Sequence, residues 1–125
     1  MNIRLSEGSI RLRLDGAEAE ELLQVNQMAV NVAWVTGSDL RVSMILSADA
    51  VRPRVRGEGL DLLVMVPRSD FMELLEQFGR RDATIAWTEF NGQGGAVDWS
   101  LEIDAFRARA KIDRSKHRVE AQELL

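Results

Sequence analysis

The chain has no cysteine and a single histidine, and both shortages limit the chemistry it can perform. Without cysteine there is no disulfide, no thiolate metal site and no cysteine nucleophile. The histidine, His117, lies in a basic C-terminal stretch away from any acid–base constellation, so a histidine-based catalytic triad is not expected. An enzyme is therefore the less favoured class of protein.

Long apolar runs are also missing. No window approaches the ~18 uninterrupted apolar residues of a membrane span, and the opening Met1-Asn2-Ile3-Arg4 is not the basic-then-apolar start of a secretory leader. We therefore expect a cytoplasmic protein with no membrane partner. At 125 residues, with 46% hydrophobic and 29% charged residues, the chain is typical of one globular domain.

Charge is distributed unevenly along the chain. Residues 1–106 hold ten arginines against seventeen acids, whereas residues 107–125 hold six lysines and arginines against three acids. We predict a single domain over 1–106 and a basic tail over 107–125 that lies on an acidic surface as a salt-sensitive strap. A weak nucleic-acid contact through this tail is the less favoured alternative, because the acidic body opposes the approach.

The stretch 60–78 is expected to supply the core. Residues 60–66 are nearly continuously apolar, which suits a strand buried on both faces. Pro67, which lacks an N–H, fits the first turn of a following helix, and Gly79 is expected to end that helix. Its apolar residues, at helical spacing, are Phe71, Leu74, Leu75 and Phe78.

The opening of the chain predicts a hairpin followed by a helix. Residues 2–6 and 9–14 alternate apolar and polar side chains around a turn at Glu7-Gly8. Asp15 and Glu18 then have the spacing of a capping box on a helix that runs to about Val25.

Further alternation predicts the remaining strands and the fold class. We expect strands over 28–36, 40–46, 51–56, 83–90 and 96–106. The order strand-strand-helix-strand-strand then occurs twice, and the short turns favour antiparallel pairing. The sequence therefore predicts an α+β fold: a mostly antiparallel curved sheet or flattened barrel of about eight strands (ββαββ twice) with two helices.

Two rows of arginines are candidate ligand-binding residues. The arginines of residues 52–56 alternate with other side chains, so their guanidinium groups leave one strand face together, and Pro53 marks that strand as an edge. Such rows can bind the phosphate or carboxylate groups of an anionic small molecule. A solvated face, charged against sheet-to-sheet aggregation, is the favoured interpretation. The candidates are Arg11, Arg13, Arg52, Arg54 and Arg56.

A row of carboxylates forms the only candidate metal site. Asp98, Glu102 and Asp104 lie opposite the apolar face of residues 97–105, and carboxylates on one strand face can hold Mg²⁺. The favoured interpretation is the solvated side of a sheet, on which these acids are the partners of an arginine row.

Four short segments carry a resemblance to other proteins: Met1-Asn2-Ile3-Arg4-Leu5, Ser9-Ile10-Arg11-Leu12-Arg13-Leu14, Val64-Met65-Val66-Pro67 and Leu101-Glu102-Ile103-Asp104-Ala105-Phe106. They resemble a family of short bacterial proteins with no assigned function. Members of that family begin with Lys-Ile-Arg and Ser-Ile-Arg-Leu-Arg-Leu strands, but their C-terminus is acidic where this one is basic. The resemblance implies a shared fold and transfers no catalytic residue.

Three functional hypotheses follow from these features. The favoured one is a non-catalytic binding or association module, without a cofactor, that forms a homodimer. The first alternative is a triphosphate-type binding protein or hydrolase, with arginines and Mg²⁺-binding carboxylates inside a barrel. The paired-glutamate signature of triphosphate-tunnel enzymes is absent near the N-terminus. The second alternative is the nucleic-acid contact of the basic tail.

Overall fold

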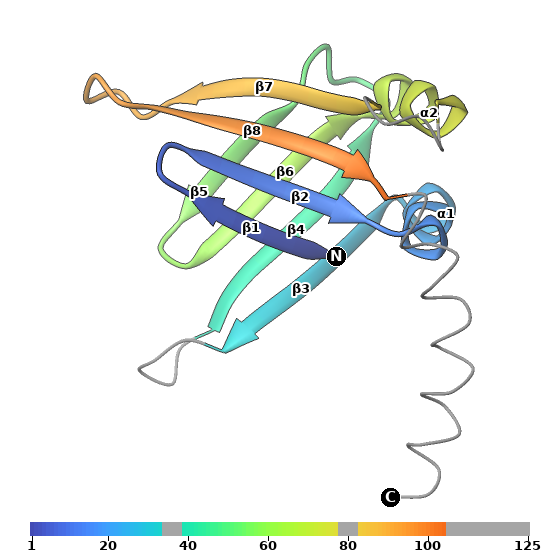
Figure 1. The fold of residues 1–125 in the computed structure, drawn as a ribbon, viewed down its shortest axis with the longest axis horizontal. Coiled ribbons are helices and arrows are strands. Elements are labelled where there is room, and N and C mark those ends of the chain that lie inside the picture. The colour runs from blue at the N-terminus through green and yellow to red at the C-terminus, as the bar shows by residue number, and fades with distance from the viewer. Residues whose placement is uncertain (34–38, 78–82, 105–125) are drawn as a thin grey trace, which may run out of the picture.

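The computed structural model describes residues 1–33, 39–77 and 83–104, and the structural statements below concern these ranges. Eight strands and two helices follow one another as ββαββ twice, which confirms the predicted α+β class (Figure 1). The elements are β1 (Asn2–Ser6), β2 (Ser9–Leu14), α1 (Gly16–Val25), β3 (Gln27–Ala33), β4 (Asp39–Ser47), β5 (Arg54–Glu58), β6 (Asp61–Pro67), α2 (Arg68–Glu76), β7 (Thr84–Phe90) and β8 (Ala96–Ile103).

The strands form two four-stranded sheets that pack face to face. The first sheet has the order β1-β2-β8-β7 and the second has the order β3-β4-β6-β5. Each sheet consists of two antiparallel hairpins joined by a central parallel pair, β2–β8 or β4–β6. Pairing is therefore mostly antiparallel, as predicted, but the described strands remain two sheets and do not close into a barrel. The strands of the two sheets cross, and both helices lie at one end (Figure 1).

The two ββαββ halves are related by a pseudo-two-fold that exchanges the sheets. The order β1-β2-β8-β7 becomes β5-β6-β4-β3, which is the second sheet read from its other edge. The register obeys the same relation: Leu14 lies opposite Ile103 in the first sheet, and Val66 lies opposite Leu46 in the second. Every strand position in one half therefore has an equivalent in the other.

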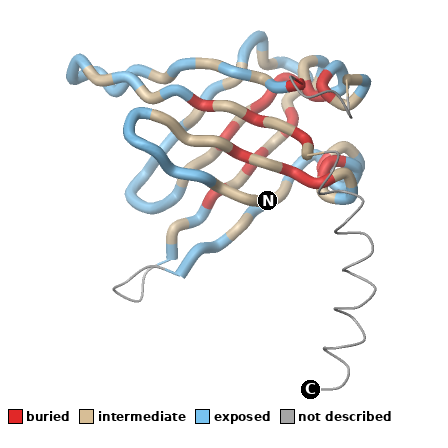
Figure 2. Tube along the Cα trace, in the orientation of Figure 1, coloured by how far each residue is buried: buried red, intermediate tan, exposed pale blue. Residues whose placement is uncertain are grey.

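The core fills the space between the sheets. Alternate residues of the four central strands are buried because successive strand side chains point to opposite faces. Figure 2 shows these positions together with the inner sides of both helices. The helices of the described ranges, ten and nine residues long, fall well short of a membrane-spanning segment. The buried residues of the central strands are Leu12, Leu14, Val42, Met44, Leu46, Val64, Val66, Trp99, Leu101 and Ile103.

The predicted capping box is present at the start of α1. The Glu18 N–H donates to Asp15 Oδ1 at 2.8 Å, and the Asp15 N–H donates to Glu18 Oε1 at 3.1 Å. Asn26 ends the helix in the left-handed region, at φ 66°, and its N–H donates to the Leu22 carbonyl at 2.8 Å. These local bonds end α1 directly before β3, an edge strand of the second sheet.

The boundaries of β5 and β6 differ from those predicted. β5 begins at Arg54, so Arg52 and Pro53 lie before the strand. Leu60 belongs to the turn, and Pro67 is the N-cap of α2. The predictions for Trp34, Phe78, Gly79, His117 and the tail 107–125 fall outside the described residues.

The substitution Leu74→Ala tests this core. Leu74 is 2% exposed on the inner side of α2, so its truncation should lower the free energy of unfolding by ~2–5 kcal/mol. Met72, on the same helix, is 46% exposed, and Met72→Ala should cost less than about 0.5 kcal/mol. Urea unfolding measures both, and equal losses would contradict the orientation of α2.

Candidate functional site

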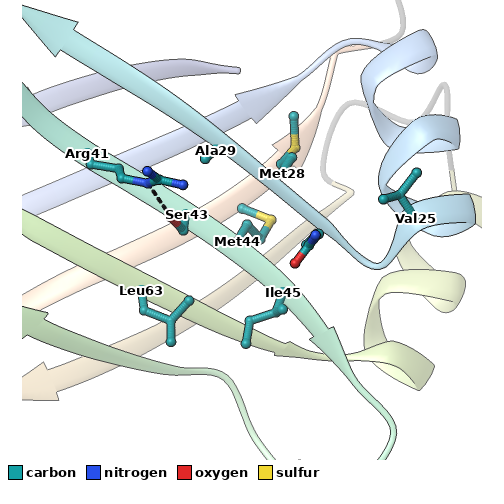
Figure 3. Close-up of a pocket in the computed structure, with 9 residues that line it drawn as sticks. Val25, Met28, Ala29, Arg41, Ser43, Met44, Ile45 and Leu63 are labelled. Atoms are coloured by element: carbon teal, nitrogen blue, oxygen red, sulfur yellow. Dashed lines mark hydrogen bonds between the residues drawn. The ribbon is translucent and has the colours of Figure 1, made fainter.

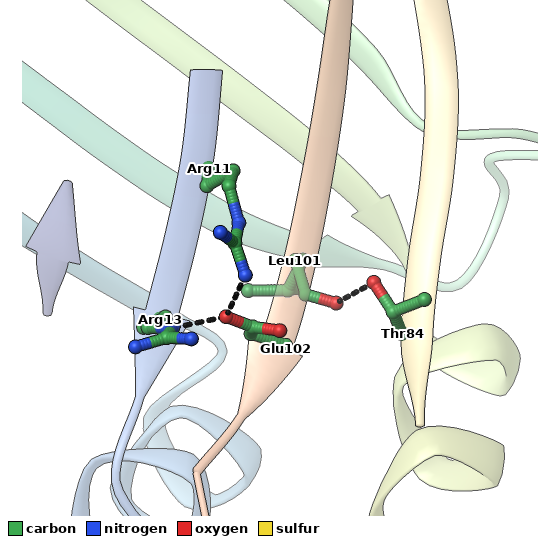
Figure 4. Close-up of polar contacts among 5 residues, drawn as sticks. All are labelled: Arg11, Arg13, Thr84, Leu101 and Glu102. Carbon is green, nitrogen blue, oxygen red and sulfur yellow. Dashed lines mark hydrogen bonds and ion pairs between the residues drawn. The ribbon is translucent and has the colours of Figure 1, made fainter. Parts of the chain in front are cut away.

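Arg11, Arg13 and Glu102 meet on the outer face of the first sheet (Figure 4). The arginines lie on β2, and Glu102 lies on the neighbouring β8, directly opposite Arg13. Arg11 Nη2 donates to Glu102 Oε1 at 3.1 Å, and Arg13 Nε donates to the same oxygen. The interpretation of an acid as the partner of an arginine row is confirmed for these three residues.

The three candidate carboxylates, all described residues, do not form one metal-binding group. Asp98 lies four residues before Glu102 on β8, a separation of ~13 Å along a strand, and Asp98 Oδ1 accepts a hydrogen bond from Thr88 Oγ1 at 2.8 Å. Asp104 follows the end of β8, and its N–H donates to the Leu14 carbonyl at 2.9 Å. Within the described ranges, no three His, Cys, Asp or Glu residues are grouped so as to hold a metal ion.

The second arginine row lies on the opposite side of the molecule. Arg54 and Arg56 project from the outer face of the second sheet, are exposed, and form no ion pair with a described residue. Arg52, before Pro53, is outside this strand. The two arginine rows therefore do not converge, and apolar side chains fill the space between the sheets. This geometry supplies no arginine-lined interior within the described chain.

The centre of the second sheet's outer face is apolar, which the residue pattern alone did not indicate. Ile45 lies opposite Met65, and Ser43 lies opposite Leu63, on the parallel pair β4–β6. Ile45, Leu63 and Met65 are half-buried. Both helices lie at one end of the sandwich, so they leave the centre of this face uncovered (Figure 1). Within the described ranges, the strand predicted to be buried on both faces is thus covered by a second layer on only one. We call this surface the apolar face.

The apolar face is hollowed. Two adjoining depressions of about 440 Å³ and about 560 Å³ share Arg41, Ser43 and Leu63 as lining residues. Figure 3 shows the smaller one. Arg41 Nε donates to Ser43 Oγ at 3.4 Å, and both side chains line the hollow. The small residue Ala29 also lines it, since a short side chain leaves room above a sheet.

Charges surround the apolar face in an ordered way. Asp61 and Glu58 are opposite each other at the turn end of β5 and β6. Arg56 and Arg54 follow at the next outward positions of β5, opposite Leu63 and Met65. The edge of the face therefore changes from acidic to basic along one strand.

Comparison of equivalent positions isolates what is unusual about this face. The pseudo-two-fold places Ile45 on Glu102, Leu63 on Arg11 and Met65 on Arg13. On the first sheet these positions carry solvated, paired charges, so the fold itself does not require apolar residues there. An apolar cluster on an open face is a mark of an interaction surface. Three residues around this cluster have the same type at the equivalent positions of the first sheet: Ala29 corresponds to Ala86, Ser43 to Ser100 and Arg56 to Arg4.

The sequence signal for this site is the apolar run of residues 60–66, which also predicts a core strand. The unbroken apolar run of residues 60–66 predicted β6 correctly, yet it could not show that only one of its faces receives a second layer. Arg41 and Ser43 carried no signal, because an alternating strand is expected to have a polar side. Comparison with family models, curated proteins and solved structures finds no match to this chain. The resemblance to the bacterial family stays a prediction.

Glu102→Gln tests the charged triad of the first sheet. The three side chains are partly exposed, so the loss of the carboxylate should lower the free energy of unfolding by no more than ~1 kcal/mol. The loss should shrink in high salt, which screens exposed charges. Urea unfolding at two ionic strengths measures both effects. Asp98→Asn, whose described partner is a neutral hydroxyl, is the control; a larger salt dependence in this control would contradict the assignment.

Proposed function

We propose that this protein is a non-catalytic association module that forms a homodimer through the apolar face. The observation that carries the proposal is the half-buried cluster of Ile45, Leu63 and Met65, where the equivalent positions of the first sheet are charged. A cytoplasmic location is part of the proposal, because the chain has no cysteine to form disulfides.

The charge pattern supports a second copy as the partner. Acidic residues lie at one end of β5 and β6, and arginines lie farther along β5. A two-fold axis in the interface, running across the strands, brings Arg54 of one copy toward Asp61 or Glu58 of the other. The apolar centre then packs against itself. Such a face is complementary to its own copy in both charge and polarity.

The size of the face predicts a weak dimer. Four strands ~4.8 Å apart, with three outward residues on each, cover roughly 20 Å by 20 Å. Two such footprints correspond to the low end of specific protein–protein interfaces. We therefore expect monomers at low micromolar concentration and dimers at high micromolar concentration.

Leu63→Arg tests the dimer. Leu63 lies midway between the acidic and basic ends of the face, so the two-fold axis brings it toward Leu63 of the other copy. The substitution places there the residue type of the equivalent position, Arg11, so folding should be retained while two like charges meet across the interface. Ser100→Arg adds the same charge to the opposite face and is the matched control. Sedimentation from 10 to 500 µM should show association of the wild type and of Ser100→Arg, but not of Leu63→Arg. A wild type that stays monomeric throughout overturns the proposal.

A second candidate function, binding of an anionic small molecule, is supported by Arg41. This side chain lines both depressions, and Arg56 borders one of them. Inorganic triphosphate at a hundredfold excess over its dissociation constant should then stabilise the protein by ~2.7 kcal/mol. Thermal melts measure this effect, and Arg41→Ala should remove it, whereas Arg52→Ala, outside the face, should not. An unchanged melt at millimolar triphosphate excludes this candidate.

A further inference from the structure

Glu89 joins the edge strands β7 and β5 of the two sheets at one corner of the sandwich, which we call the sealed corner. It is an inward-facing residue of β7, the edge strand of the first sheet, and it follows Ile85 and Trp87 on that face. Glu89 Oε1 accepts a hydrogen bond from the N–H of Val55 at 2.7 Å, on the edge strand of the second sheet. An edge N–H that is already bonded cannot pair with a further strand, so Glu89 protects this edge.

The opposite corner lacks this protection. The pseudo-two-fold places Ile3 of β1 on Val55 and Val32 of β3 on Glu89. It also places Leu5 on Gly57. The sealed corner thus has a carboxylate and a glycine, whereas the other has two apolar side chains, with Val32 39% and Leu5 61% exposed.

The backbone of β1 is available at this open corner. The two-residue turn Glu7-Gly8 sets Ser6 opposite Ser9, and ladder bonds then recur at every second residue. Ile3 and Leu5 are the intervening residues, so their N–H and C=O groups point away from β2. Among the described residues, no side chain bonds to these groups.

The described residues also leave part of the inner face of the second sheet exposed near this corner. In Figure 1 the ends of β3 and β4 that lead into residues 34–38 extend past β1. Val32 and Leu40, opposite each other at these ends, are accordingly exposed and half-buried, respectively. A strand added beside β1 would direct alternate side chains onto this apolar surface.

The other side chains of an added strand would meet positive charge. Arg4 projects outward from β1 next to Arg11, is exposed, and forms no ion pair with a described residue. Glu102 is the acid that offsets Arg11 and Arg13 there. A second copy of β1 would bring one Arg4 close to another, and the basic stretch 107–118 has the wrong charge. Acidic side chains are therefore favoured beside β1.

We infer that the free edge of β1 binds an extended peptide segment of a partner protein in which acidic and apolar residues alternate. The segment adds a fifth strand to the first sheet: its backbone pairs with Ile3 and Leu5, its apolar side chains cover Val32, and its carboxylates face Arg4. This edge is separate from the apolar face, so the homodimer and the peptide site stand or fall independently.

A synthetic peptide of alternating glutamate and valine, capped at both ends, is the probe. Titrated into the full chain with a fluorescent label, it should bind saturably with one site. The lysine–valine counterpart should not bind at the same concentrations, because Arg4 repels it. N-methylation of alternate backbone nitrogens should weaken binding by at least about tenfold, since strand donors are lost. Equal binding of all three peptides, or none by the acidic one at millimolar concentration, overturns the inference.

Substitutions at the two corners give the sharper test. Val32→Glu copies the protection of the sealed corner and should weaken peptide binding by at least about tenfold, whereas the near-isosteric Val32→Thr should not. Glu89→Val should open the sealed corner and raise the stoichiometry from one peptide to two. Circular dichroism melts check that each variant is folded. Unchanged affinity in Val32→Glu, or a stoichiometry that stays at one in Glu89→Val, overturns the inference.

Discussion

Parallel pairing of the two central strands in each sheet is the constraint on which the rest of this structure depends. β2 and β6 each lead directly into a helix, while their parallel partners β8 and β4 run in the same direction beside them. This arrangement gathers both helices at one end and turns each hairpin partner into an edge strand. The interior is then filled from four central strands, so the outer faces and edges are what remain for binding.

Local structure was predictable because it depends on neighbouring residues. The Asp15–Glu18 capping box, the Glu7-Gly8 hairpin and the alternating face of β8 needed only propensity and period. The division into two sheets was not predictable, because it depends on strands far apart in sequence: β2 pairs with a strand close to the other end of the domain. The short turns favoured antiparallel neighbours, and they could not reveal the two parallel pairs.

The candidate site was predicted only in part, for the same reason. Alternation placed Arg11 and Arg13 on one face correctly, and Glu102 reaches both because β8 happens to be their neighbour. Arg52 lies before β5 begins and is therefore outside its predicted row. Whether an apolar run such as residues 60–66 is covered on one side or two depends on the number of layers, which periodicity does not contain.

Differences between the two halves are the most informative feature of this protein. Both halves form the same fold. A position that is charged in one half and apolar in the other is therefore not constrained by that fold. Burial of exposed apolar surface is worth roughly 25 cal/mol per Å², and Leu63 and Met65 gain it only when another surface covers them. Glu102 and Arg11 are charged and solvated. The apolar residues at the equivalent positions, Ile45 and Leu63, therefore indicate contact with a partner.

Concentration-dependent NMR spectra test the central claim most directly, because they locate association without altering the chain. Between ~10 µM and 1 mM, for the weak interface expected here, the backbone amides of Ser43, Ile45, Leu63 and Met65 should shift. The equivalent amides of Ser100, Glu102, Arg11 and Arg13 should not shift. Shifts confined to the first sheet, or an unchanged spectrum over this range, would contradict the account.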